Sequence, residues 1–200
     1  VLEMTPKGLR DVIDPSRAFL TERRENVPGS VVVPTLEGSR PLLVEVQALT
    51  SPTVLPTPRR VANGIDSSRL LLVCAVLTRR LGVSLSGQDV IVNVAGGLRI
   101  EETGVDLAVA LAILSSHYGA AMPTATVVLG EVGLGGEIRG VPQFEHRLNE
   151  AARLGFSRCV GPQSTIPVDK NGGIKSMEIL TAASLGDAIR LVLPDLQIGG

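Results

Sequence analysis

The chain has 200 residues, 44% of them hydrophobic, so it is long enough to bury a core and too apolar to stay disordered. Its formal net charge of −1 excludes a strong overall attraction to nucleic acids or membranes and confines any such binding to a local patch. Only 2% of the residues are aromatic, so the core is expected to consist of Val, Leu, Ile and Ala. All but three of the 19 basic residues are arginine, whose forked guanidinium suits carboxylate and phosphate.

Sulfur and histidine chemistry is sparse. Cys74 and Cys159 lie in apolar runs without metal-ligand spacing, which predicts buried free thiols in a reducing compartment. His117 and His146 cannot by themselves supply the three or four ligands of a zinc site, so we expect no metal site. No signal peptide and no apolar run of about 18 residues occurs, which predicts a cytoplasmic protein without a membrane partner.

Residues 1–29 are expected to form a lead-in segment. Asp14 and Pro15 predict the start of a short helix, because Asp is a good N-cap and Pro suits the first helical position. The first four residues, VLEM, are typical of the end of a strand whose sheet would lie upstream.

The rest of the chain alternates between strand and helix patterns. Runs of β-branched residues predict strands at 30–34, 42–48, 89–95, 126–130, 159–161 and 177–180. Helical periodicity and caps predict helices at 66–81, 103–116, 142–154 and 184–193. Residues 131–141 are expected to form a hairpin, and 49–63 and 164–173 to be loops. Together these elements predict one α+β domain at 30–194, with mixed sheets, packed helices and a tail at 195–200.

The central stretch is the expected helix after Gly96. Residues 107–114 contain no polar side chain, so this helix should be covered on several sides. Thr103 is the expected N-cap, with Asp106 completing a pair similar to a capping box. Glu101, Glu102 and Asp106 would complement the helix dipole, and general acid–base chemistry is the alternative interpretation.

Two further patterns concern phosphate. The glycines of GEVGLGGEIRG lack a following GK[ST] and lie in the expected hairpin, so they indicate a turn instead of a phosphate loop. The arginines near the loop at 49–63 and the helix after it form a candidate surface for phosphate contacts, and ordinary salt bridges with the 20 acidic residues are the alternative.

Several stretches resemble a known family. VNVAGGLRIEETGVDLAVALAILSS and VVLGEVGLGGEIRGVPQFEHRLNEAARLGF resemble the proteolytic domain of Lon proteases. VPTLEGSRPLLVEVQALTSPT and PRRVANGIDSSRL, at 33–53 and 58–70, resemble more closely the Lon-like C-terminal domain of RadA (Sms) proteins, bacterial DNA-repair ATPases of the RecA superfamily. The resemblance covers the whole chain and implies the Lon protease fold, similar to domain 2 of ribosomal protein S5.

The resemblance also implies where catalytic residues would lie. Active Lon proteases use a Ser at the start of the central helix and a Lys on the helix after the hairpin, a nucleophile activated by a nearby amine. Gly104 and Glu145 occupy these two positions here, so we expect that the protease dyad is lost and that the fragment is not an enzyme. A residual peptidase using Thr103 or Ser115 is an alternative.

The remaining expectations follow from the RadA resemblance. It implies a homo-hexameric ring that binds single-stranded or double-stranded DNA for an ATP-driven branch-migration motor, with the recombinase RecA as a candidate partner. Neither GxxxxGK[ST] nor CxxC is present, so we expect no cofactor in this fragment, with ATP, Mg and Zn bound by missing N-terminal domains. A pure oligomerisation scaffold without DNA affinity is the second alternative. The expected DNA contacts are Arg59, Arg60 and Arg69, followed by Arg79, Arg80 and Arg99.

Overall fold

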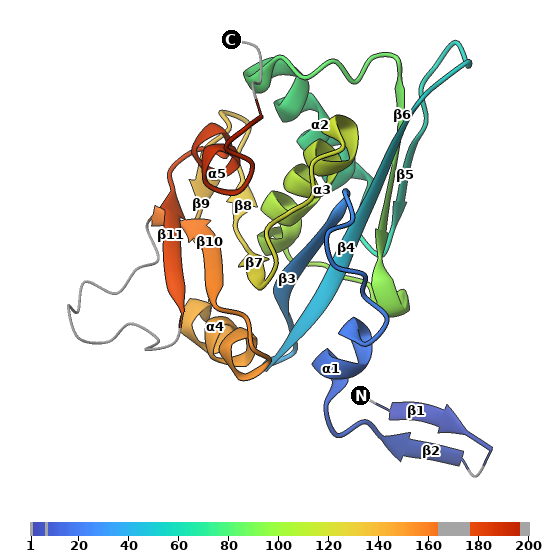
Figure 1. The fold of residues 1–200 in the computed structure, drawn as a ribbon. Helices are drawn as coiled ribbons and strands as arrows, with labels where there is room; N and C mark the ends of the chain where they lie inside the picture. Colours follow the sequence, from blue (N-terminus) through green and yellow to red (C-terminus); the bar gives the residue numbers. More distant parts are fainter. Residues whose placement is uncertain (1, 7, 164–176, 197–200) are drawn as a thin grey trace.

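A seven-stranded sheet organises the computed structural model, which describes residues 2–6, 8–163 and 177–196 (Figure 1). The strand order is β11-β10-β7-β3-β4-β6-β5. Neighbouring strands are parallel except for the antiparallel pairs β3–β4 and β4–β6. The mixed sheet and its helices are consistent with the expected α+β class. The strands are β3 (Ser30–Glu37), β4 (Arg40–Pro52), β5 (Arg60–Asn63), β6 (Gln88–Val94), β7 (Thr126–Val128), β10 (Arg158–Pro162) and β11 (Glu178–Ala182).

The loop prediction for residues 49–63 was wrong at both of its ends. β4 continues to Pro52, and a separate strand, β5, begins at Arg60. Both segments pair with β6, which lies on the far side of a helix in the sequence. Long-range pairing therefore outweighed the local proline signal. The expected loop at 164–173 lies outside the described residues.

The helix boundaries follow their capping residues closely. Asp66 accepts a 2.8 Å hydrogen bond from the Ser68 N–H at the start of α2, and Gly82 ends that helix with a φ of 67°. Gln143 adopts a left-handed conformation, so α4 begins two residues later than predicted. The helices are α1 (Pro15–Leu20), α2 (Ser67–Leu81), α3 (Asp106–Tyr118), α4 (Phe144–Arg153) and α5 (Leu185–Val192).

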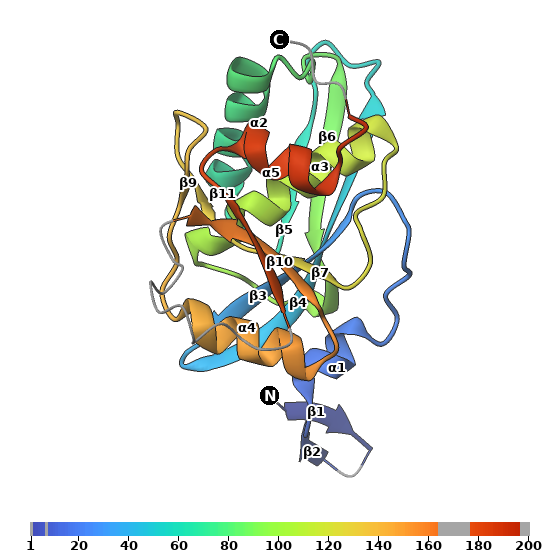
Figure 2. The same ribbon diagram turned by 60° about the vertical axis from the view of Figure 1, so that its left-hand side comes forward.

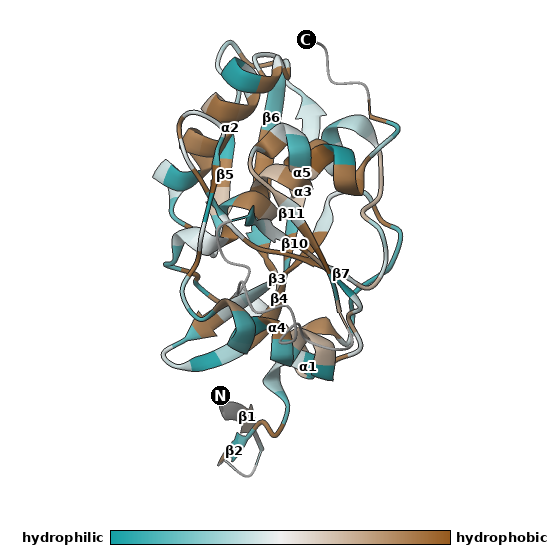
Figure 3. Ribbon diagram, turned by 90° about the vertical axis from the view of Figure 1, so that its left-hand side faces the viewer, coloured by the Kyte–Doolittle hydropathy of each residue, from teal (hydrophilic) through white to brown (hydrophobic). Residues whose placement is uncertain are grey.

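Helix α3 lies in the middle of the molecule, between β4 and α5 (Figures 1 and 2). Its residues 107–114 are each at most 1% exposed, and Figure 3 shows the apolar colour along this helix. The buried residues of α2 form one stripe that includes Leu70, Val73, Cys74 and Leu77. These observations confirm the prediction that the central helix is covered on several sides.

The predicted capping box at the start of α3 was wrong. A 3-10 turn, Thr103–Val105, precedes the helix, and its cap residue Val105 makes no side-chain cap bond. Thr103 instead donates its hydroxyl to Glu131 Oε2 at 2.5 Å, and Asp106 pairs with Arg69. Both polar side chains are therefore taken by partners that are distant in the sequence.

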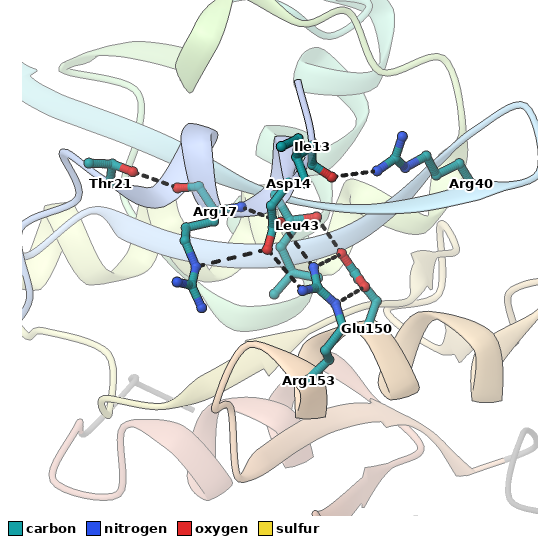
Figure 4. A network of polar contacts seen from close by, with 9 residues as sticks. Ile13, Asp14, Arg17, Thr21, Arg40, Leu43, Glu150 and Arg153 are labelled. Atoms are coloured by element: carbon teal, nitrogen blue, oxygen red, sulfur yellow. Dashed lines mark hydrogen bonds and ion pairs between the residues drawn. The ribbon is translucent and has the colours of Figure 1, made fainter. Parts of the chain in front are cut away.

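The N-terminal segment contains a hairpin of β1 (Leu2–Thr5) and β2 (Gly8–Asp11), outside the seven-stranded sheet. Residues 2–4 of the expected strand therefore pair with residues that follow them. Helix α1 is fixed to α4 by Arg153, which donates to Asp14 at 2.8 and 3.0 Å and also to Glu150 (Figure 4). Asp14 caps α1 as predicted.

Smaller features agree with the sequence predictions. The strands β8 (Glu131–Val132) and β9 (Ile138–Arg139) form the expected hairpin. Cys74 and Cys159 are buried free thiols, and burial raises the pKa of both. Among the helices of the described residues, none combines the length and the apolar character needed to cross a bilayer.

Candidate functional site

Gly104 lies in the buried turn before α3, at the position to which the resemblance to Lon proteases assigned the nucleophile. Its carbonyl accepts a 2.9 Å hydrogen bond from the Gly130 N–H, which ties the turn to the end of β7. A Cβ atom added here would lie 3.1 Å from Val141 Cγ1 and 3.7 Å from Glu102 Oε2. Even a methyl group at this position would therefore require a small movement of Val141.

On α4, Glu145 is exposed, and the side chain that lies in the interior is that of Arg147. Arg147 is 1% exposed and donates to both oxygens of Glu102, at 2.7 and 2.5 Å. It also donates to the backbone carbonyls of Pro34 and Pro142, at 3.0 and 2.9 Å. An ion pair between the buried Arg147 and the part-buried Glu102 thus occupies the region to which the resemblance assigned the Lon dyad.

Glu102 remains ionised in this arrangement. Burial raises its pKa, but hydrogen bonds from Arg147 and from the Thr35 hydroxyl, at 2.6 Å, outweigh burial and leave the pKa below its ordinary value. Since the carboxylate is committed to these donors, it serves as a structural anion between α4 and β3. The sequence signal for Arg147 is its position three residues after Phe144 and one before Leu148, on the buried face of the helix.

A second pair joins α2 to α3. Asp106 is 1% exposed, pairs with Arg69 and accepts a 3.2 Å hydrogen bond from the Val132 N–H. Burial raises the pKa of Asp106, and the bond from Arg69 opposes this shift. Arg69 is therefore needed inside the fold, and only 27% of its side chain is exposed.

Ser115, one of the two residues considered for residual peptidase chemistry, is inaccessible. It is 0% exposed, accepts a 2.8 Å hydrogen bond from the Gly29 N–H and donates a 2.6 Å bond to the Ala120 carbonyl. Both roles fix the N-terminal segment and the end of α3. The hydroxyl is thus occupied in holding the fold.

The six candidate arginines lie in two groups at opposite ends of α2. Arg69 and Arg99 lie near its start, where Arg99 lines a pocket with Asp66 and Ser67. Near its end lie Arg79 and Arg80 on the helix itself, together with Arg60 at the start of β5, which packs against α2, and Arg59 directly before that strand. Arg69 and Arg79 are ten residues apart on the helix, which at a rise of about 1.5 Å per residue separates them by roughly 15 Å. The structure therefore does not bring all six to one surface.

The first three candidates already have internal partners. Arg59 forks onto Asp89 at 2.8 and 2.5 Å, and Arg69 pairs with Asp106. Arg60 donates to three backbone carbonyls, and its positive charge has no carboxylate partner among the described residues.

The second three are freer. Arg79 is exposed and makes no hydrogen bond or ion pair with any described residue. Arg80 is exposed and donates a single bond to the Leu134 carbonyl, at 3.1 Å. The side chain of Arg99 is 75% exposed and lies 3.9 Å from its only described ion-pair partner, Glu101. The sequence ranked Arg59, Arg60 and Arg69 first as DNA contacts, whereas the second three candidates have fewer partners inside the fold and are more available to a ligand.

Fold and site together define a mixed α/β domain in which buried ion pairs fix the central helix and free arginines remain on the surface. Residues 60–165, more than half of the chain, match the family model described as subunit ChlI of Mg-chelatase. The chain therefore belongs to this ChlI family.

Three relatives of the chain share the name DNA repair protein RadA. It is similar to the DNA repair protein RadA of Halalkalibacterium halodurans, with 44% identity over 96% of this chain and 42% of the relative. It is similar to the RadA proteins of Synechocystis sp., with 43% identity over 97% of this chain and 38% of the relative, and of Pseudomonas aeruginosa, with 45% identity over 94% and 42%. The chain thus spans about two fifths of the length of these relatives.

These matches correct two expectations. The fragment was expected not to be an enzyme, whereas its matched family is described as a subunit of the enzyme Mg-chelatase, and its alignment with RadA covers 96% of the chain. The fragment was also expected to need no cofactor, and the same matches favour ATP and Mg²⁺ for this region. Both expectations had rested on the absence of short motifs: the Ser–Lys dyad for the enzyme, and GxxxxGK[ST] and CxxC for the cofactors.

The residues of the matched region do not fit a phosphate-loop site for ATP and Mg²⁺. The sequence has no GxxxxGK[ST] motif, and none of its three lysines, Lys7, Lys170 and Lys175, lies within 60–165. In the part of the chain that the structure describes, no group of three or more His, Cys, Asp or Glu side chains is placed to hold a metal ion. The family match and the donor set of this chain therefore disagree.

Proposed function

We propose that this chain is the DNA-binding, ring-forming Lon-like domain of a RadA-type DNA repair protein. The names of its relatives support the repair role, since all three are DNA repair proteins with at least 43% identity over nearly the whole chain. The ion pair between the buried Arg147 and the part-buried Glu102, beside Gly104, supports a structural role for the start of α3.

One observation carries the DNA-binding part of the proposal. Arg79 and Arg80 are adjacent, exposed and without a carboxylate partner among the described residues, at the same end of α2 as the carbonyl-bound Arg60. Guanidinium groups without internal acids are available to phosphate, and contacts to phosphate need no net positive charge on the whole protein. In a ring, the same group would be repeated around one channel, which would compensate for the net charge of −1.

The test is a DNA titration of the chain at several salt concentrations. Arg79→Ala/Arg80→Ala should weaken binding to any sequence and reduce the slope of log K against log salt by about 2, because each phosphate contact contributes about 0.9. Arg40→Ala/Arg158→Ala, on β4 and β10, removes the same charge and should leave the slope unchanged. Equal slopes in both double variants would contradict the assignment to Arg79 and Arg80.

A chain that assembles but has no DNA affinity at any salt concentration would support the scaffold alternative instead. Particle mass and DNA affinity therefore have to be measured on the same preparation. Arg69 is left out of this DNA titration. Its replacement would leave the buried Asp106 without a positive partner, so DNA binding would fall through unfolding of the chain.

A further inference from the structure

A polar pocket of about 480 Å³ lies where β5 and β6 end side by side. These strands are parallel, and Asn63 is the register partner of Asn93. The core side of β6 carries Val92 and Val94, which are at most 2% exposed, so Asn93 points to the opposite face of the sheet. The carboxyl ends of adjacent parallel strands are a common place for ligand sites.

The walls of the pocket are held together before any ligand arrives. The Ile100 N–H donates to the Gly64 carbonyl at 2.8 Å, which joins the connection after β6 to the connection after β5. Gly64 has a φ of 82°, and a Cβ atom there would lie 2.5 Å from the Leu98 carbonyl oxygen. This close approach needs glycine and keeps the pocket preformed.

Polar groups without partners converge on this pocket. The side chains of Asn63, Asn93 and Ser67 line it and make no hydrogen bond with any described residue. Asp66 also lines it, and both of its cap bonds end on Oδ1, so Oδ2 can accept from a ligand. Arg99 completes the lining, with only the distant contact to Glu101.

These groups match the parts of a nucleotide. A carboxamide presents a donor beside an acceptor, which suits the edge of a nucleobase, as in the bidentate contact of Asn with adenine. A carboxylate oxygen can accept from a sugar hydroxyl, and a guanidinium can fork onto phosphate. The volume lies within the roughly 300–1,000 Å³ of small-molecule sites.

We propose that this pocket binds one nucleotide unit, with its base edge on Asn63 and Asn93 and its phosphate on Arg99. Such a unit has two sources, a free nucleotide or one residue of a single DNA strand. The site is separate from Arg79 and Arg80, at the opposite end of α2.

The test is an NMR titration of the whole chain that follows the side-chain amide signals of Asn63 and Asn93. The probes are AMP, ATP, adenosine, and an oligo(dA) of about ten nucleotides. Saturable shifts with AMP or ATP identify a free-nucleotide site, and shifts with oligo(dA) alone identify a strand site. Adenosine should bind more weakly than AMP, and Arg99→Ala should abolish that difference.

Variants of the lining residues test whether nucleotide binding takes place in this pocket. Asn63→Ala/Asn93→Ala should weaken the binding at least tenfold, whereas Asn149→Ala, which removes an exposed carboxamide on α4, should not. Asn93→Asp keeps the shape of the side chain and should also weaken binding, which separates recognition from misfolding. Unmoved amide signals with all four probes, or equal affinity in the double variant and the control, would overturn the proposal. Arg79→Ala/Arg80→Ala should leave the AMP titration unchanged, so failure of the proposed DNA surface would be distinguishable.

Discussion

Single residues at the start of α3 carry much of the specificity of this fold. Glu102 and Asp106 each meet an arginine from another helix, Arg147 of α4 and Arg69 of α2. A buried pair contributes little beyond what apolar residues of the same volume would contribute, but loss of one partner leaves an uncompensated charge inside. The two pairs therefore determine how α2, α3 and α4 dock together.

Arg147→Met tests whether the Arg147–Glu102 pair stabilises the docking of these helices. Methionine fills a similar volume but leaves Glu102 without its positive partner and the carbonyls of Pro34 and Pro142 without their donor, so the free energy of unfolding should fall by about 3–5 kcal/mol. Urea unfolding followed by circular dichroism would measure it.

Two matched variants complete that measurement. Arg139→Met removes an arginine that is 59% exposed on the β8–β9 hairpin and should cost at most about 1 kcal/mol. Adding Glu102→Gln to Arg147→Met should recover part of the loss. If Arg147→Met costs no more than Arg139→Met, the buried pair is not a determinant of stability.

The sequence predicted the burial of this region but not the partners of its charged side chains. The apolar stretch at 107–114 predicted a buried helix, because burial follows directly from hydropathy. The roles of Glu102 and Asp106 were assigned to the helix dipole, because their true partners lie 45 residues later and 37 residues earlier. Local spacing carries no information about which distant arginine completes a pair.

At the level of elements, the caps of α1, α2 and α5 were predictable, whereas the cap of α3 and the pairing of β5 were not. Asp66 and Gly82 bound α2 as expected, because an N-cap and a left-handed C-cap act on their own helix. β5 was missed, because a strand of four residues exists only through its pairing with β6. The pocket at the ends of β5 and β6 was missed for the same reason.

The cap of α5 gives an element-scale prediction. The Ser184 hydroxyl accepts from the Asp187 N–H at 3.2 Å, and the Asp187 carboxylate accepts from the Ser184 N–H at 3.0 Å. Ser184→Ala should lower the free energy of unfolding by about 1 kcal/mol in a urea titration. Ser157→Ala, at an exposed serine outside the helices, should change it by less than about 0.5 kcal/mol. Equal effects would show that the capping box is dispensable.

The contact of α1 with α4 should depend on pH. The hydrogen bond from Arg153 lowers the pKa of Asp14 from its ordinary value of 3.8 to about 2. A lowered folded-state pKa contributes stability that is complete above about pH 4 and is lost as the pH falls toward 2. Asp14→Asn should therefore be less stable than the unmodified chain at pH 6, and the gap should narrow toward pH 2. A gap that stays constant over this range, in thermal melts, would contradict the role of the Asp14–Arg153 bond.

For the whole molecule, several exposed apolar side chains lie near the edge of the sheet at β5. Leu49 is 61% exposed, Val54 99%, Leu55 46% and Val61 38%, on β4, β5 and the connection between them. A net charge of −1 gives little repulsion between copies. The proposed ring requires an apolar surface of this kind, and an open sheet edge beside it can also pair with a second copy.

Carboxylates introduced on this apolar surface should therefore dissociate the proposed ring into single chains. Val54→Glu/Leu55→Glu should reduce the mass in light scattering from about six chains to one, because burying two carboxylates at a subunit contact costs more than the contact supplies. Ile13→Glu, at a residue that is 95% exposed on the N-terminal segment, should leave the mass unchanged. The dissociated variant should also bind DNA more weakly than the ring, since the arginines of neighbouring copies no longer act on one strand. A single-chain mass for the unmodified protein would contradict ring formation by this chain, and an unchanged mass in the double variant would place the subunit contact elsewhere.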